Sequence, residues 1–330
     1  MRPVRYAGAF VALVVLAGSV VLTLARVLTP GGHAWVLLTS FVPWALVGYL
    51  LAGLLLGLLC WRSRRRLLPA VGVALAAVGL LLHAFWLAPS FVVSGSASTD
   101  GVPVRVMTLN LQYGRADTDS VVRLAKRLRP DLVVLEETTP DALAGLEAQE
   151  VGSAAGSWPH QAGAAAPGAS GTVVLSRYPL VEDTSFALGN GGARMEVRAP
   201  TPFTLTAVHA IYPLLGTEAW EQDFRTLTAD ARETPGPHLV VGDFNATLDH
   251  RPMRTLLDAG LTDAAEDAGS GWQPTWPRPG SRAPNGITVP LRLMAIDHVL
   301  MSEGLSASST STHVVADTDH LALVAVVRPG

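Results

Sequence analysis

Eight polar side chains stand at the points where short apolar segments of the chain begin or end. The sequence Gly242–Asn245 (GDFN) directly follows one such segment, and the pair Asp319-His320 directly precedes another. The full set is Asn110, Glu137, His209, Asp243, Asn245, Asp297, Asp319 and His320. Hydrolysis of a phosphoester requires a cation that neutralises the phosphate, a base that orients water and an acid for the leaving group. The carboxylates, amides and imidazoles of this set can supply all three.

The residue types also exclude several other kinds of site. Amide and carboxylate oxygens are hard ligands, which suit Mg²⁺, with Mn²⁺ as the alternative. The chain has a single cysteine, Cys60, which excludes a thiolate zinc site and an intramolecular disulfide. It contains no H-E-x-x-H zinc motif, no G-x-S-x-G nucleophile elbow and no P-loop. We therefore expect Mg²⁺ as the cofactor.

The segments that carry these side chains alternate between strand-like and helix-like patterns from Val104 onward. Amphipathic runs such as Asp119–Leu128, Ala219–Ala231 and Pro252–Ala259 predict helices. The predicted strands are Val104–Leu111, Leu132–Leu135, Thr172–Leu175, Thr204–Val208, His238–Val241, Ala295–Leu300 and Leu321–Val326, and the predicted loops include Ala162–Gly171 and Gly269–Asn285. This mixture indicates an α/β domain with one core, in which rigid strand ends position the polar side chains. The pattern leaves open whether the domain has one doubly wound sheet or two sheets packed face to face.

Three long apolar runs precede this domain, at about residues 6–28, 34–60 and 67–87. Each has the length of about 20 residues that a helix needs to cross the hydrocarbon core of a bilayer. A cleavable signal peptide is the alternative for the first run, but its apolar region is only about 7–15 residues long. We expect a transmembrane domain over residues 1–93, a linker over 94–103 and a catalytic domain over 104–330.

Arginines predict how these helices are oriented in the membrane. Arg2 and Arg5 precede the first run, and the cluster Arg62–Arg66 separates the second run from the third. Because cytoplasmic loops are enriched in Lys and Arg, we expect the N-terminal segment and the Arg62–Arg66 loop to lie in the cytoplasm. The N-terminus is then cytoplasmic, and the catalytic domain lies outside the cytoplasm at the cell membrane. Binding of an anionic lipid is the second interpretation of the Arg62–Arg66 cluster.

Seven short segments of the chain resemble, in order, those of the endonuclease/exonuclease/phosphatase superfamily. They are TLN (Thr108–Asn110), LEE (Leu135–Glu137), GTVVLSRYPL (Gly171–Leu180), VH (Val208-His209), GDFN (Gly242–Asn245), IDHVL (Ile296–Leu300) and TDH (Thr318–His320). The resemblance covers about Val104 to Val327. It implies a four-layer α/β/β/α sandwich, with the site at one edge of two sheets, behind the three N-terminal transmembrane helices.

The resemblance also implies a role for each polar side chain. Asn110 and Glu137 resemble Mg²⁺ ligands, and Asp319 resembles a second carboxylate on the metal side. Asp243 resembles the residue that orients or deprotonates the attacking water. Asn245 resembles a donor to the phosphoryl oxygens in the transition state.

Two histidines complete the implied catalytic set. His320 resembles the histidine that contacts the phosphate, with Asp297 as its carboxylate partner. His209 resembles the other catalytic histidine, with donation of a proton to the leaving group as its expected role.

The chain departs from the family pattern at three places. Glu136-Glu137 stands where Gln-Glu is usual, Ala295 replaces a frequent arginine, and Thr318 replaces a common serine. Because strand neighbours point to opposite faces, we expect Glu137 alone at the site. Ser176-Arg177-Tyr178-Pro179 is interpreted as a structural strand end, with Arg177 near the site as the weaker alternative.

Charge and the membrane runs guide the prediction of the substrate. From Asp100 onward the chain carries all 27 acidic residues and 17 of the 24 basic ones, a formal net charge of −10. This balance disfavours double-stranded nucleic acid, which basic surfaces bind. A tether to the membrane favours a lipid-linked phosphate or pyrophosphate of the cell envelope.

The chain also resembles three-span actinomycete members associated with glycopeptide-antibiotic resistance, which points to undecaprenyl pyrophosphate. An extracellular Mg²⁺-dependent nuclease and a non-catalytic envelope-binding protein are the alternatives. The complete acid and base set counts against the last of these.

Overall fold

The computed structural model describes residues 2–61, 67–94, 101–149, 151–152, 156–183, 186–282, 286 and 288–330. Two compact units are present, Met1–Pro89 with Asp249–Arg251, and Ser90–Leu248 with Pro252–Gly330. The arginine cluster at residues 62–66 and linker residues 95–100 lie outside the described residues. The predictions made for those segments therefore remain predictions.

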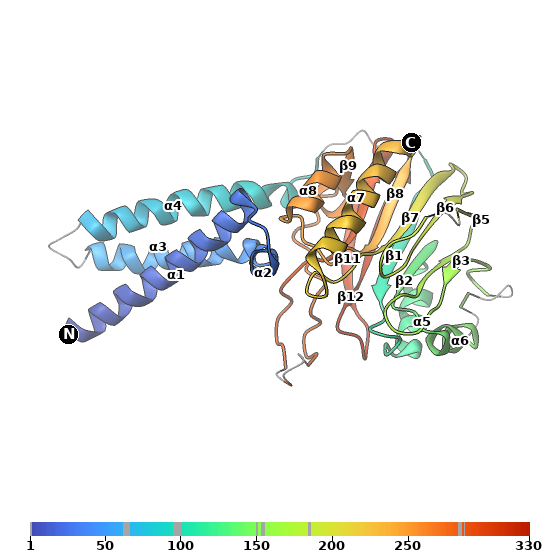
Figure 1. Cartoon of the computed structure of the whole chain (residues 1–330), viewed down its shortest axis with the longest axis horizontal. Helices are drawn as coiled ribbons and strands as arrows, with labels where there is room; N and C mark the ends of the chain where they lie inside the picture. The colour runs from blue at the N-terminus through green and yellow to red at the C-terminus, as the bar shows by residue number, and fades with distance from the viewer. Residues whose placement is uncertain are drawn as a thin grey trace. The chain divides into compact units, whose positions relative to one another are not determined.

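The N-terminal unit consists of apolar helices. They are α1 (Arg2–Leu28), α2 (His33–Thr39), the 3-10 helix η1 (Val42–Trp44), α3 (Ala45–Trp61), α4 (Leu67–Leu87) and the 3-10 helix η2 (Ala88–Phe91). Helix α3 packs against both α1 and α4 (Figure 1). Small side chains such as Ala12, Ala52 and Ala76 are buried where these helices meet, which allows close packing. Large apolar side chains such as Tyr6 and Phe85 remain exposed, as a lipid-facing surface requires.

Three stretches of this unit are long and apolar enough to cross a membrane: Tyr6–Leu28, Val42–Trp61 and Pro69–Phe91. The prediction of three N-terminal apolar helices is thus confirmed. The prediction of one continuous helix over residues 34–60 is wrong, because α2 ends at Thr39 and α3 begins only at Ala45. Pro43 lies in the intervening 3-10 turn, and proline lacks the N–H that an uninterrupted α-helix needs.

The second unit contains two sheets of six strands each. The first sheet has the order β11 (Leu305–Val314), β12 (Leu321–Pro329), β1 (Val104–Asn110), β2 (Leu132–Glu136), β4 (Thr172–Ser176) and β3 (His160–Ala164). The second has the order β5 (Leu180–Asp183), β6 (Gly192–Val197), β7 (Phe203–His209), β8 (His238–Asp243), β10 (Asp297–Ser302) and β9 (Leu261–Asp263). A buried core that includes Val106 and Val134 from the first sheet and Leu205 and Val241 from the second joins their inner faces.

Helices cover the outer faces of both sheets. Helices α5 (Thr118–Leu128) and α6 (Pro140–Glu147) bury Val121, Leu124 and Leu146 against the first sheet. Helix α7 (Thr217–Glu233) lies beside β8 of the second sheet (Figure 1), with Trp220 and Phe224 buried. Two shorter helices, α8 (Arg251–Leu257) and α9 (Ala264–Asp267), complete the unit. The expected four-layer α/β/β/α sandwich is confirmed.

The strands that the sequence did not predict lie mostly toward the sheet edges. Strands β3, β5, β9 and β11 are the edge strands, and β6 is next to β5. β3 also overlaps the loop expected over Ala162–Gly171, because Ala162–Ala164 pair with β4. Edge strands often carry polar residues that prevent further pairing, as the sequence LSASSTSTHV of β11 does. Such segments lack the apolar pattern of a buried strand.

Strand directions bring the predicted polar residues to one edge of the sandwich. β1 runs parallel to β2, and β7 runs parallel to β8, so each pair ends at the same edge. β10 is antiparallel to β8 and β12 is antiparallel to β1, so these strands begin where their neighbours end. Asn110 is therefore paired with Glu136, and Asp243 with both His209 and Asp297.

Candidate active site

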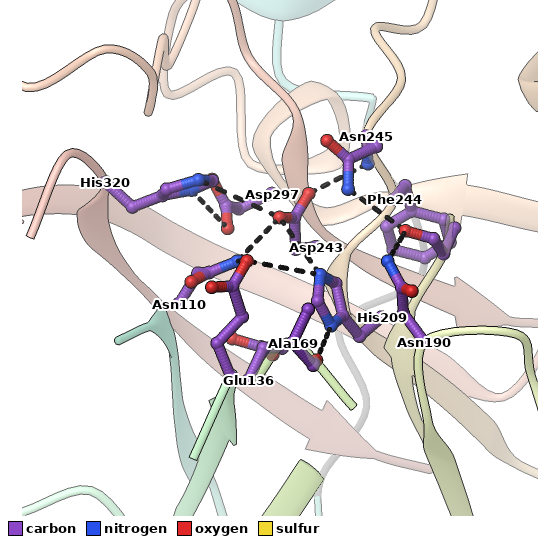
Figure 2. A network of polar contacts seen from close by, with 12 residues as sticks. Asn110, Glu136, Ala169, Asn190, His209, Asp243, Phe244, Asn245, Asp297 and His320 are labelled. Carbon is purple, nitrogen blue, oxygen red and sulfur yellow. Dashed lines mark hydrogen bonds and ion pairs between the residues drawn. The ribbon is translucent and has the colours of Figure 1, made fainter. Parts of the chain in front are cut away.

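Asn110 connects the two sheets at this edge. Its Nδ2 atom donates to Oε1 of Glu137 at 3.1 Å and to Oδ2 of Asp243 at 3.0 Å. Its Oδ1 atom accepts a hydrogen bond from the backbone N–H of Gln112 at 2.8 Å. Figure 2 shows the side chains of Asn110, His209 and Asp243 pointing toward one another. The amide group thus lies between two carboxylates that would otherwise repel each other.

His320 and Asp297 form the second part of the site. Nδ1 of His320 lies 3.0 Å from Oδ2 of Asp297, and Nε2 lies 3.8 Å from Oδ2 of Asp243. Burial by itself lowers the pKa of His320, but the charge and hydrogen bond of Asp297 and the charge of Asp243 raise it to about 10. At neutral pH the ring is therefore an imidazolium, suited to contact an anionic group.

His209 is held in one orientation by the loop that follows β3. Its Nδ1 atom lies 2.9 Å from the carbonyl oxygen of Ala169, which accepts only, so Nδ1 carries the proton. Its Nε2 atom lies 3.7 Å from Oε1 of Glu137 and 3.9 Å from Oδ2 of Asp243. Burial lowers the pKa of His209, against the charge of Glu137, which raises it. No pattern of residue types marks Ala169, because its backbone carbonyl makes the contact.

Asp243 and Asn245 share one turn after β8. Burial and the nearby charge of Asp297 raise the pKa of Asp243 to about 7. Its Oδ1 atom accepts a hydrogen bond from the backbone N–H of Asn245 at 2.8 Å. Asn245 has a φ of 48°, in the left-handed region that asparagine tolerates, and its Nδ2 donates to the carbonyl of Ala210 at 3.0 Å. Asn190, which sequence reasoning missed, donates to the same carbonyl at 3.5 Å.

Glu136 ends β2 and lies beneath the site, whereas Glu137, the next residue, contacts Asn110 and His209. The expectation that Glu137 alone acts at the site stays a prediction. Glu136 is fully buried, and Oγ1 of Thr108 donates to its Oε1 at 2.7 Å. Its Oε2 atom has no hydrogen-bond partner among the described residues. Burial raises the pKa of Glu136 well above its usual range, and the charges of Asp297 and Asp243 add to this effect.

The end of β2 explains the positions of the two carboxylates. Glu136 is the register partner of Asn110, so both side chains point to the inner face of the first sheet. Glu137 has a φ of 53°, which ends the extended conformation and returns its carboxylate to the site. There its Oε2 accepts from the backbone N–H of Tyr113 at 2.6 Å. Strand register, rather than local alternation, was the signal that could have found Glu136.

Asp319 and Arg177 lie outside this network of contacts. The Oδ2 atom of Asp319 accepts a hydrogen bond from the indole of Trp276 at 3.0 Å, a residue that sequence reasoning missed. Arg177 contacts Asp131 at 3.5 Å, at the end of β4 opposite to the site. The alternative that placed Arg177 near the site is therefore wrong, and its strand-end interpretation is supported.

Two overlapping groups of side chains could hold a divalent cation. One is Asp243, Asp297 and His320, whose ligand atoms lie within 4.8 Å of one another. The other consists of the oxygens of Glu137 and Asp243 around the Asn110 amide. We favour the second group, because Asp297 and His320 of the first group already contact each other at 3.0 Å. Burial raises the pKa of both carboxylates of this group, and a cation that neutralises them fits such a site.

Comparison with known proteins gives the family. The model of the "Endonuclease/Exonuclease/phosphatase family" matches residues 107–320, which include the end of β1 and reach His320. The chain belongs to this family. Its members hydrolyse phosphoester bonds and generally use a divalent metal. No curated protein sequence matches the chain.

Solved structures of the family share the fold. The endonuclease/exonuclease/phosphatase from Beutenbergia cavernae is 20% identical, with a TM-score of 0.51, and the match covers 69% of this chain and 72% of that one. The 3′ phosphatase NExo from Neisseria, bound to a product DNA hairpin, is 20% identical with a TM-score of 0.51, covering 67% and 98%. D. rerio TDP2 with a single-strand DNA product is 13% identical with a TM-score of 0.52, covering 68% and 99%. At these identities the likeness concerns the fold alone.

Proposed function

We propose that the protein is a membrane-anchored, Mg²⁺-dependent hydrolase that cleaves a lipid-linked phosphate or pyrophosphate outside the cytoplasm. Mn²⁺ is the alternative metal. The observation that carries the hydrolytic part is the convergence of Asn110, Glu137, His209, Asp243 and His320 at one edge of the sandwich. A binding protein would have no need of a buried base beside a buried imidazolium.

The contacts at this edge support a division of labour. Asp243, once deprotonated, accepts a proton from the water that attacks phosphorus. His320, held by Asp297, donates to a phosphate oxygen, and Asn245 stabilises the charge that develops on the phosphoryl group. The bond to the leaving oxygen breaks as that oxygen gains a proton, which the imidazolium of His320 is able to supply. The predicted acid, His209, carries its one proton on Nδ1 and has a lowered pKa, so it would donate only after Nε2 is protonated. Asn110 and Glu137 would hold Mg²⁺, which would neutralise phosphate charge. Asp319, the further carboxylate of the prediction, accepts a hydrogen bond from Trp276 and lies outside their network of contacts.

Two features support a membrane lipid as the source of the phosphate. The chain carries three helices that are able to cross a membrane, and a tether raises the local concentration of a membrane-resident substrate. The part from Asp100 onward has a net charge of −10, which disfavours a long polyanion. The resemblance to three-span actinomycete proteins adds undecaprenyl pyrophosphate as the specific candidate, with a role in glycopeptide resistance. The N-terminus is proposed to be cytoplasmic.

An extracellular nuclease is the second candidate. Its support comes from two structures of the same fold. One is a 3′ phosphatase bound to a product DNA hairpin, and the other holds a single-strand DNA product. The third candidate, a non-catalytic envelope-binding protein, is disfavoured by the completeness of the site.

The decisive experiment offers several substrates to the full-length protein in lipid nanodiscs with Mg²⁺. These are undecaprenyl pyrophosphate, plasmid DNA, single-stranded DNA and a water-soluble phosphodiester. Asp243→Ala is compared with Glu303→Ala, whose exposed side chain lies in the turn after β10, at the far end of that strand from Asp297. Release of phosphate from the lipid that is lost only in Asp243→Ala supports the proposal. DNA cleavage with the same dependence favours the nuclease, and inactivity on every substrate favours the binding protein.

A further inference from the structure

Two loops at the edge that carries the site expose large apolar side chains. Tyr113, in the turn after β1, is 54% exposed. Tyr212, Leu214 and Leu215, between β7 and α7, are 39%, 45% and 79% exposed. We call these four residues the apolar rim. Exposed apolar groups that gather beside a polar site often mark a place where a ligand binds.

The backbone of both loops is part of the site itself. The N–H of Tyr113 donates to Glu137 at 2.6 Å. Tyr212 stands three residues after His209 and two after Ala210, whose carbonyl accepts from Asn245 at 3.0 Å. Burial, and then the neighbouring Tyr113, raise the pKa of Tyr212, so the two phenol groups lie within electrostatic range of each other. A molecule whose phosphate occupies the site would thus have the apolar rim beside it.

The loop between β7 and α7 is fixed in place rather than loosely exposed. Asp223 of α7, which is buried, accepts hydrogen bonds from the N–H of Ile211 at 2.8 Å and of Gly189 at 2.9 Å. The N–H of Leu215 donates to the carbonyl oxygen of Tyr212 at 2.9 Å, and this hydrogen bond closes a turn. The fold therefore holds two leucines in water at a defined place. This exposure is unfavourable unless an apolar partner covers them.

We propose that the apolar rim binds the hydrocarbon chain of the substrate and selects amphiphilic, membrane-resident phosphoesters over water-soluble ones. The inference rests on the proposed function and adds the residues that recognise the lipid. Three membrane-crossing stretches on the same chain give access to such a substrate. Arg115, whose guanidinium lies 5.8 Å from the ring of Tyr113, adds a positive charge beside the rim for a headgroup phosphate.

Single-stranded nucleic acid is the competing ligand, because its bases stack on aromatic rings. Proteins that bind it combine such rings with a positively charged groove. Here the part of the chain from Asp100 onward has a net charge of −10, and half of the rim is leucine, which offers no flat surface for stacking. Charge and side-chain type therefore both favour the hydrocarbon chain.

The test compares two substrates that share a headgroup and differ in chain length. The full-length protein in nanodiscs with Mg²⁺ is given a long polyprenyl pyrophosphate and its five-carbon analogue, and single-stranded DNA is offered separately. The first variant is the double substitution Leu214→Ser and Leu215→Ser. The second variant is the single substitution Tyr212→Ser. The control is Val181→Ser, which is 44% exposed on β5. Val181 pairs with Glu196 and Glu196 with Thr204, near the end of β7 opposite to His209.

We expect the double variant to lower kcat/KM for the long chain about tenfold, mainly through KM, because two leucines no longer cover the chain. The five-carbon substrate should change less than twofold, and the control should match wild type on both. Equal loss on both substrates, or no loss, overturns the inference. Loss confined to single-stranded DNA assigns the rim to base stacking instead. Failure of the wild type to cleave any pyrophosphate would contradict the proposed function itself, which distinguishes the two failures.

Discussion

His320 and Asp297 form a buried ion pair, with Nδ1 of the ring 3.0 Å from Oδ2 of the carboxylate. The pair joins the residue before β12 of the first sheet to the first residue of β10 in the second. It places an imidazolium next to Asp243, the proposed base.

Removing the charge of Asp297 should cost activity mainly at high pH. Asp297→Asn removes the largest influence that raises the pKa of His320, so the ring loses its proton at a lower pH. We expect kcat to fall about 100-fold at pH 7.5, as for loss of a positioned acid or base. The alkaline limb of the pH–rate profile should also move down from about 10. Profiles of wild type, Asp297→Asn and the control Glu303→Gln check this, and an unmoved alkaline limb in Asp297→Asn would contradict it.

The same pair should affect stability with a definite sign. The pKa of His320 is raised from 6.5 to about 10 in the folded protein. Its contribution is therefore fully present below pH 6.5 and is lost as the pH rises through about 10. Thermal melts of wild type and His320→Gln, taken from pH 6 to 10.5, should converge at the alkaline end. A difference in Tm that is constant across this range would argue against the ion pair.

The titration of Asp243 should produce the acidic limb of the pH–rate profile. Its pKa of about 7 means that the base is half protonated near neutrality, so the rate should rise as the pH increases through 7. A bound cation favours the ionised carboxylate, so raising Mg²⁺ should shift this limb to lower pH and Mg²⁺ should bind more tightly above pH 7. Rates measured at several Mg²⁺ concentrations test both effects. An acidic limb that is independent of Mg²⁺ would place the cation away from Asp243.

Glu136→Gln should be tolerated, and Glu136→Ala should not. Glutamine keeps an oxygen that accepts from Thr108 and carries no charge, whereas alanine leaves a cavity and should destabilise the domain by about 2–4 kcal/mol. A carboxyl with a raised pKa favours the fold when protonated, so wild-type stability should fall as the pH rises above 4.5. Glu136→Gln should weaken this fall. Melting curves of wild type and Glu136→Gln at pH 5 and pH 8 test this prediction. A Glu136→Gln protein that is less stable than wild type at pH 8 would show that the fold needs the charged carboxylate.

His298 should support the catalytic turn from behind. Its Nδ1 lies 2.9 Å from Oδ2 of Asp263, and its Nε2 lies 3.0 Å from the carbonyl of Ala246, the residue after Asn245. His298→Phe leaves the carboxylate of Asp263 buried without this partner, and we expect a loss of about 3–5 kcal/mol together with a lower kcat. His313→Phe, at a partly exposed position on β11, is the control. A His298→Phe protein of wild-type stability would contradict this role.

Much of the fold could be predicted from the sequence because the signals are local. The apolar runs predicted three stretches that are long and apolar enough to cross a membrane, although Pro43 interrupts the second predicted helix. The central strands showed continuous apolar runs that end in polar residues, and segments such as GDFN and TDH indicated the family. Each of these signals is contained in a few neighbouring residues.

The order of residues along the chain sets which of them lie at strand ends and what chemistry their side chains can perform. Only the tertiary structure decided which of them meet, since Asn110 and Asp243 are 133 residues apart and become neighbours through the packing of two sheets. The tertiary structure also determines that Glu136 points to the inner face of its sheet and that Arg177 lies at the end of β4 opposite to the site. It further determines that His320 is charged at neutral pH while His209 is not. The physical reason is that side-chain direction follows strand register, and pKa values follow burial and nearby charge. Both depend on contacts between segments that are distant along the chain.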